Sequence, residues 1–264
     1  MVKKHFIRGL MAAACILPLA ACAGGGGSAA NRAIDTNYVA RDVNTLYTLA
    51  KENLDRGSYS RAALVFAEVE RQHPYSIWAR RAQLMGAFAH YQANDYAEAI
   101  GAANRFLAIH PGNKDAPYAN YLIAMSYYNQ IEDVSRDQRI TEQARDVFGE
   151  LVRRYPNSRY AADARIKIDL VNDQLAGKEM EVGRFYQDTR RWIPATIRFQ
   201  NVVDDYQTTA HVPEALHRLV ESYLALGVTT EAQKAAAVLG ASYPDSEWYE
   251  RSYQLMRRYN ADQT

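Results

Sequence analysis

One four-residue pattern recurs five times between residues 62 and 244, and it constrains the fold more than any other feature of this chain. In every copy a small residue is followed by apolar residues four and seven positions later, and in four copies by proline twelve positions later. Offsets of four and seven place the three side chains on one face of an α-helix, and the proline ends that helix. The fourth copy has Gln207 in the place of proline. The copies begin at Ala62, Ala99, Ala144, Ala195 and Ala232.

A second amphipathic helix precedes most copies, separated from it by a tight turn. Segments 45–56 and 78–93 are such helices, and Ala50 and Ala87 within them allow two helices to approach closely. A helix–turn–helix unit of about 34 residues is the tetratricopeptide repeat. We therefore predict an all-α fold, a right-handed α-solenoid of five tetratricopeptide repeats, because stacking buries the apolar face of each unit. The predicted turns are marked by Gly57, Asn94, Arg190 and Gly227.

The spacing of the copies locates two insertions, since successive copies lie 37, 45, 51 and 37 residues apart. The charged segment 131–141 predicts a loop inside the third repeat. Segment 158–190 lacks proline and predicts one long helix, with Gly177 and Gly183 as points where it could bend. We assign repeats one to three to residues 35–157, and repeats four and five with a capping helix to residues 158–264.

Residues 1–21 are a predicted lipoprotein signal peptide, because three basic residues precede an apolar stretch too short to span a bilayer. The segment Leu19-Ala20-Ala21-Cys22 resembles the bacterial lipobox, which implies cleavage before Cys22 and acyl and diacylglycerol lipids on that residue. Several acyl chains on one residue give stable anchoring. Residues 22–34 are then a lipidated, flexible, glycine-rich tether. The alternative is a secreted protein cut at the same bond with an unmodified cysteine.

Charge and motifs indicate neither nucleic-acid binding nor catalysis. The chain has 31 basic and 30 acidic residues, whereas a nucleic-acid-binding surface needs a basic stripe. The sequence has no nucleophile elbow, phosphate-binding loop or dinucleotide-binding motif. Glu214 and His217 have the spacing of a di-metal half-site, but there is no second pair, so we expect a solvated helix face. We predict no enzyme activity, no metal and no cofactor apart from the lipid on Cys22.

The first helices of the first three repeats carry a set of aromatic residues. In a tetratricopeptide solenoid these helices line the concave side, where tyrosine and methionine suit adaptable capture of peptides. The alternative is that the same rings are ordinary packing between repeats. Counting from Ala50, Ala87 and Ala124, the predicted peptide-binding groove consists of Tyr47, Leu84, Phe88, Tyr91, Tyr118, Tyr121, Met125 and Tyr128.

A different residue set gathers around the turn of the fourth repeat. Arginine and tryptophan are enriched at protein–protein interface hot spots, so this turn is a candidate partner-docking surface. The alternative is a solvated turn. The candidate docking residues are Arg184, Arg190, Arg191 and Trp192, and the closing helix carries Arg251, Arg257 and Arg258 on an expected polar cap.

The lipobox, the short tether and the five repeats together resemble the BamD family of outer-membrane assembly lipoproteins. The local resemblance is strongest over residues 151–160, the charged segment 135–137 and the turn 188–192. The resemblance implies a non-catalytic, periplasm-facing scaffold of the β-barrel assembly machine, anchored in the outer membrane. In that family the C-terminal repeats dock the POTRA region of BamA, and the N-terminal repeats are proposed to meet unfolded outer-membrane protein precursors. Other Bam lipoproteins are the further implied partners.

A second function belongs to a different class. Tetratricopeptide proteins also act as periplasmic scaffolds that coordinate peptidoglycan or cell-envelope enzymes. A long coiled-coil segment before the repeats would favour that function, and residues 23–34 leave no room for one.

Overall fold

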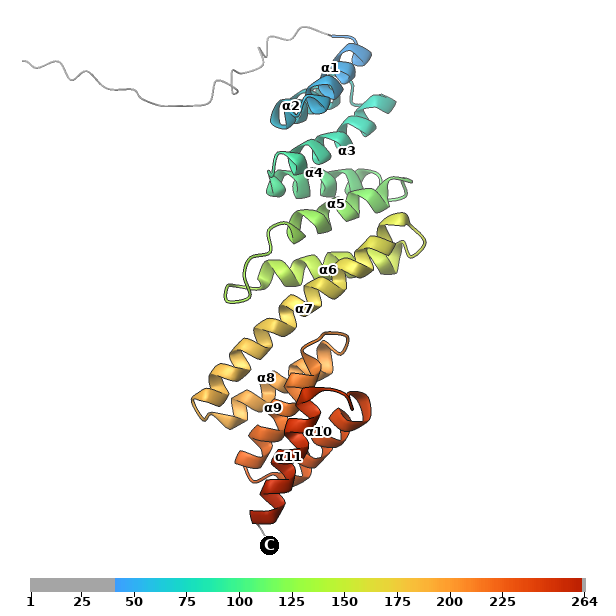
Figure 1. Ribbon diagram of the computed structural model, residues 1–264. Coiled ribbons are helices and arrows are strands. Elements are labelled where there is room, and N and C mark those ends of the chain that lie inside the picture. The colour runs from blue at the N-terminus through green and yellow to red at the C-terminus, as the bar shows by residue number, and fades with distance from the viewer. Residues whose placement is uncertain (1–40, 263–264) are drawn as a thin grey trace, which may run out of the picture. The chain divides into compact units, whose positions relative to one another are not determined.

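The computed structural model describes residues 41–262, which contain eleven α-helices and no strand (Figure 1). The all-α tetratricopeptide solenoid is confirmed: α1 to α10 form five helical pairs, and α11 follows as a closing helix. The helices are α1 (Val43–Asp55), α2 (Tyr59–Gln72), α3 (Ile77–Gln92), α4 (Tyr96–Ile109), α5 (Ala116–Tyr128), α6 (Arg139–Arg154), α7 (Arg159–Asp188), α8 (Trp192–Asp205), α9 (Val212–Ala225), α10 (Thr229–Ser242) and α11 (Glu247–Asp262).

The turn inside four of the five repeats has one geometry. The amide that closes the turn donates to a helix carbonyl five residues back, as in the bond from the Arg191 amide to the Tyr186 carbonyl (2.8 Å). This pattern is the Schellman motif, in which one residue adopts a positive φ. The four residues marked in the sequence occupy that position: Gly57 (φ 75°), Asn94 (60°), Arg190 (58°) and Gly227 (75°).

The second helix of every repeat ends in the same way, even where proline is missing. The residue after each helix has φ between −128° and −137°, and its amide donates to the helix carbonyl four residues back. Tyr206, before Gln207, follows this geometry with φ −128°. The exit is therefore set by the helix and the following turn, and proline is one of several residues that fit there. The five residues are His73, His110, Tyr155, Tyr206 and Tyr243.

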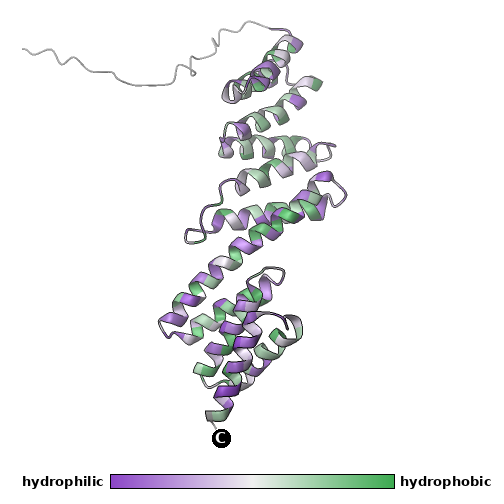
Figure 2. Cartoon of the chain, viewed as in Figure 1, coloured by the Kyte–Doolittle hydropathy of each residue, from purple (hydrophilic) through white to green (hydrophobic). Residues whose placement is uncertain are grey.

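The repeating positions form the core, and polar residues lie between them along each helix (Figure 2). Phe66, Phe106, Phe148 and Phe199 are at most 1% exposed, as is Leu239 in the last repeat. Each helix packs against the next one in the chain, and α11 covers α9 and α10. The arginines of α11 are exposed, as expected of a polar cap.

The two insertions lie where the spacing predicted them. Segment 159–188 is one helix of 30 residues, α7, which continues through Gly177 and Gly183. The charged insertion is a loop that ends when α6 begins at Arg139, so the last residues of the predicted loop are helical. The side-chain amide of Gln138 closes the loop, because its Nε2 donates to the carbonyls of Asp133 (3.2 Å) and Arg136 (3.0 Å).

Candidate functional site

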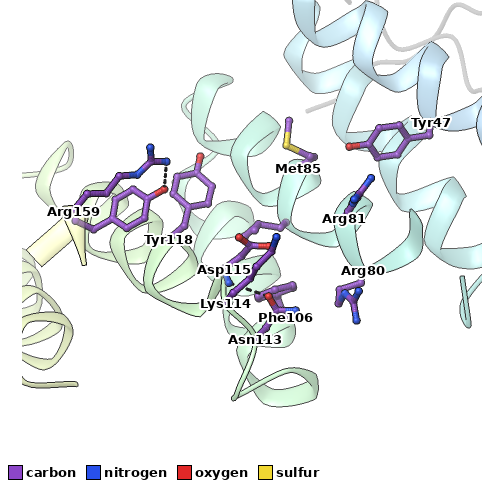
Figure 3. Close-up of a pocket in the computed structure, with 12 residues that line it drawn as sticks. Tyr47, Arg80, Arg81, Met85, Phe106, Asn113, Lys114, Asp115, Tyr118 and Arg159 are labelled. Carbon is purple, nitrogen blue, oxygen red and sulfur yellow. Dashed lines mark hydrogen bonds between the residues drawn. The ribbon is translucent and has the colours of Figure 1, made fainter. Parts of the chain in front are cut away.

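A cavity of about 620 Å³ opens among the first three repeats and the start of α7 (Figure 3). Its walls come from five helices, α1, α3, α4, α5 and α7, and from the loop before α5. Its lining combines aromatic, apolar and charged side chains: Tyr47, Arg80, Arg81, Leu84, Met85, Phe106, Asn113, Lys114, Asp115, Tyr118, Arg159 and Tyr160.

The charged lining of this cavity is mostly positive. The lining holds four cationic side chains and one carboxylate, that of Asp115. A concave surface lined by one sign of charge concentrates ions of the opposite sign. Arg159 is held in place, because its guanidinium lies 4.8 Å from the Tyr160 ring centre and donates to the Tyr160 hydroxyl (2.6 Å). The cavity therefore suits a ligand with acidic or carboxylate groups beside apolar ones.

Three tyrosines pack against one another beside the cavity, between α5 and α7. The Tyr160 ring centre lies 5.4 Å from that of Tyr118 and 5.2 Å from that of Tyr121. The Tyr121 hydroxyl donates to Asp163 Oδ2 (2.7 Å). Burial raises the pKa of both Tyr118 and Tyr121, and Asp163 raises the pKa of Tyr121 further.

The predicted groove residues divide into two groups. Tyr47, Leu84 and Tyr118 line the cavity. The others lie partly buried against the cores of neighbouring repeats, where the Tyr91 hydroxyl accepts from Asn129 Nδ2 (2.9 Å). This second group, which makes the inter-repeat contacts that were the alternative interpretation, consists of Phe88, Tyr91, Tyr121, Met125 and Tyr128.

Sequence reasoning missed the cationic lining of the cavity. Arg80 and Arg81 lie one helical turn before Leu84, a predicted groove residue, so counting all residue types along this face would have found them. Lys114 and Arg159 carry no such signal. They come from an inter-repeat loop and from the first residue of α7, and only the fold brings them to the cavity.

The repeat-four turn keeps three of its four candidate residues together. Arg190 and Arg191 are exposed, and Trp192 is half-buried at the first position of α8. Arg184 is instead part of an ion-pair network between α7 and α9. Its guanidinium pairs with Glu214 (3.3 Å) on α9, and Glu214 also pairs with Arg218 (3.3 Å). Large apolar side chains are exposed beside the turn, namely Phe185 (61%), Ile193 (63%) and Ile197 (55%).

The expectation that His217 lies on a solvated helix face is wrong. The side chain is 5% exposed, its Nδ1 lies 2.8 Å from Ser252 Oγ, and its ring packs on Trp248. Glu221 lies 3.4 Å from Nε2. The histidine thus joins α9 to α11, because a buried imidazole needs polar partners and the closing helix supplies one. Within residues 41–262 no cluster of potential metal ligands is present.

The remaining predicted features lie outside the described residues. These are the signal peptide, the lipidation site Cys22 and the tether. Among residues 41–262 there is no helix with the length and hydrophobicity needed to cross a membrane.

A family model and the curated relatives of this chain point to the same family. The family model YfiO, described as an outer membrane lipoprotein, matches residues 39–239. The outer membrane protein assembly factor BamD of Caulobacter vibrioides is 50% identical over 243 residues, covering 92% of this chain and 79% of its own. The protein of the same name in Rickettsia prowazekii is 45% identical over 225 residues, covering 85% of this chain and 90% of its own. Among solved structures, a tetratricopeptide protein of Thermus thermophilus aligns with 83% of this chain and 98% of its own, at 19% identity and a TM-score of 0.39.

Proposed function

The chain belongs to the BamD family of non-enzymatic outer membrane protein assembly factors, and from that premise we propose that it is a lipid-anchored adaptor with two binding ends. Repeats four and five dock the POTRA region of a BamA-like barrel protein. Repeats one to three present a cavity to unfolded outer-membrane protein precursors, and other Bam lipoproteins complete the assembly. Lipids on Cys22 hold the chain to the outer membrane on its periplasmic side.

The observation that carries the proposal is the cationic, aromatic cavity of the N-terminal repeats. An unfolded precursor is an extended chain with alternating apolar side chains and free polar groups. Tyr47, Tyr118 and Met85 offer broad, adaptable apolar contact for such a chain, while the arginines attract its carboxylates. The cavity is also open to solvent and lined by side chains from several helices, so a segment of precursor can enter and leave it.

The repeat-four turn supports the docking half of the proposal. Exposed Arg191 directly precedes Trp192 at the start of α8, and large apolar side chains are exposed on both helices of the repeat, at Phe185 of α7 and at Ile193 and Ile197 of α8. A patch with apolar residues, tryptophan and arginine is the usual composition of an interface core. Arg184 is left out of this surface, because Glu214 already holds it between α7 and α9.

Charge reversal in the cavity tests substrate presentation. We expect the double variant Arg81→Glu/Lys114→Glu to bind an unfolded barrel precursor about tenfold more weakly at low ionic strength, with the difference shrinking as salt is added. The matched control is Arg105→Glu/Arg153→Glu, which reverses two exposed cations, on α4 and α6, outside the cavity. Equal binding by both variants would exclude the cavity as the precursor site.

Co-purification tests docking. A tag at Thr264 and gentle detergent extraction are expected to recover a POTRA-bearing barrel protein, and Arg191→Glu/Trp192→Ala is expected to lose it. Arg153→Glu is the control, because it reverses an exposed arginine on α6. Recovery that is unaffected by the turn variant would move the docking surface elsewhere. Recovery of cell-wall enzymes without any barrel protein would instead favour the scaffold of cell-envelope enzymes.

A further inference from the structure

The segment where the chain leaves the second helix of a repeat, around the proline position, is called the repeat exit. The exits of the first two repeats carry large apolar side chains that project into solvent. Tyr75 is fully exposed, and Ile77 and Ile109 are 61% and 60% exposed. All three border a second, shallow groove of about 450 Å³ between the α2–α3 turn and the end of α4. We name Tyr75, Ile77 and Ile109 the exit edge.

The later repeats lack such side chains at the same positions. The exit geometry is common to all five repeats, so the positions one and three after the proline, and two before it, can be compared directly. Only repeats one and two place a large apolar residue at any of them. The corresponding residues of repeats three to five are Asn157, Arg159 and Arg154, then Thr208, Ala210 and Asp205, and finally Asp245, Glu247 and Ser242. The exposed apolar character of the exit edge is therefore a local feature and not a property of the repeat.

The described chain begins beside this edge. The Arg41 amide donates to Gln72 Oε1 (3.1 Å), and its carbonyl lies 2.8 Å from His73 Nε2. His73 directly precedes Pro74 and Tyr75. Arg41 lies 19 positions after Cys22, and a chain of that length spans at most about 65 Å when fully extended. The segment that leads from a lipid on Cys22 thus joins the solenoid at the repeat exit that carries Tyr75.

We propose that the exit edge rests on the phospholipid surface in which the chain is anchored. Tyrosine suits the headgroup level, where its ring is shielded and its hydroxyl stays hydrated, and isoleucine gains from burial just below that level. The exposed Arg80, which borders both this groove and the larger cavity, adds attraction to anionic headgroups. The inference rests on the lipid anchor of the proposed function and adds a second membrane contact to it.

The contact has a consequence for the larger cavity. A second contact with the membrane restricts the orientation of a chain that is otherwise held only by its lipids. Because Arg80 lines both hollows, the cavity is then kept close to the membrane surface. Precursors would therefore meet the cavity near the membrane that they are to enter.

A single fluorescent label tests the contact. The only cysteines of the chain are Cys15, in the signal peptide, and Cys22, which is acylated, so an introduced cysteine is labelled uniquely. The lipidated protein with Tyr75→Cys, carrying an environment-sensitive dye, is placed on vesicles of phosphatidylethanolamine and phosphatidylglycerol. Spin labels at the headgroup level of the lipids are expected to quench this dye. Asn157→Cys and Asp245→Cys, at the matching position of later repeats, are the controls and are expected to stay bright.

Two further outcomes separate this inference from its premise. Protein that fails to float with the vesicles would disprove the lipid anchor, and this proposal with it. Protein that floats but shows equal quenching at the three labelled positions would overturn the membrane contact alone. Adding Ile77→Ser and Ile109→Ser to the Tyr75→Cys chain is expected to relieve the quenching, because these exposed side chains serve no core. Quenching that persists in this variant would show that the tether, and not the exit edge, brings position 75 to the lipid.

Discussion

At the scale of single residues, Gly183 is the position of α7 where an added side chain would meet a buried ring. A Cβ added there would lie 2.5 Å from Cε1 of Phe199, which is fully buried, whereas a Cβ at Gly177 would meet nothing closer than 3.5 Å. Alanine favours a helix over glycine by about 1 kcal/mol, but overpacking costs about 1–3 kcal/mol. We expect Gly183→Ala to lower the free energy of unfolding and Gly177→Ala to leave it equal or higher, as measured by urea denaturation. Equal stability of the two variants would show that Phe199 moves aside without cost.

Arg190 has a left-handed backbone conformation that arginine rarely adopts. Its φ is 58°, and the equivalent positions of repeats one and five hold glycine. A left-handed conformation costs an L-residue about 1–2 kcal/mol, part of which glycine gives back through its greater freedom when unfolded. Arg190→Gly is therefore expected to raise the free energy of unfolding by up to about 1 kcal/mol. Asn94→Gly should raise the free energy of unfolding by less, because asparagine tolerates the left-handed conformation better than arginine does. Lower stability of Arg190→Gly in thermal unfolding would contradict the turn assignment.

The same residue shows what sequence can and cannot resolve at this scale. The repeat spacing placed Arg190 in a turn, its residue type made it a docking candidate, and the structure gives it a backbone role that is independent of any partner. Core positions such as Phe148 were predictable because a helix face repeats at fixed offsets. The partner of His217 could not be predicted from the sequence, because Ser252 lies 35 residues away and reaches the histidine only when α11 folds back on α9.

At the scale of helices, Glu221 of α9, which lies beside His217 and accepts a hydrogen bond from Gln187 Nε2 of α7 (3.1 Å), is expected to make the stability of the C-terminal repeats dependent on pH. Burial alone would raise its pKa, but hydrogen bonds and charge attraction from His217 and Arg218 outweigh burial and hold the pKa below its ordinary value of 4.5. A carboxylate with a lowered folded-state pKa stabilises the fold fully above the unfolded value, and this contribution is lost as pH falls through the folded value. We therefore expect stability to fall below pH 4.5, and Glu221→Gln to make that fall shallower.

Glu247→Gln is the control for this experiment, because it removes an exposed carboxylate that pairs with Arg251 on the surface of α11. The measurement is the urea midpoint as a function of pH for the three chains. A pH profile of Glu221→Gln that matches the parent below pH 4.5 would show that another carboxylate controls acid unfolding.

Helix existence was easier to predict than the way in which helices are joined. The long α7 was predictable because thirty residues without proline follow a clear N-terminal cap, Ser158. The conformation of the 131–138 loop could not be predicted in the same way. It depends on Lys178 Nζ, which donates to the Ser135 carbonyl (3.1 Å), and on Gln174, which donates to the Glu132 carbonyl (3.0 Å), both from α7.

At the scale of the whole described chain, the core is divided. One cluster joins Met180, Phe199 and Leu219 with the closing helix, and another joins Phe148 with Leu151 and Val171. Tyr206 packs against both. In a solenoid each repeat contacts only its neighbours, so stability is a sum of local contributions and regions can open separately. The repeat count was predictable from sequence, but this division was not, because it follows from where α7 changes neighbours.

Hydrogen exchange can detect the division. Phe199→Ala removes a fully buried ring from the C-terminal cluster, which costs about 3–5 kcal/mol locally. We expect amides of α8, α9 and α10 to exchange faster while those of α3 and α4 keep their protection, because the core cluster of the first group shares no residue with the clusters that contain α3 and α4 within the described part of the chain. Phe66→Ala, which removes an equally buried ring from α2, is the matched control and should show the reverse pattern. Faster exchange in all helices of either variant would instead mean that the five repeats unfold as one cooperative unit, and that the contacts of Tyr206 and α7 transmit stability along the entire solenoid.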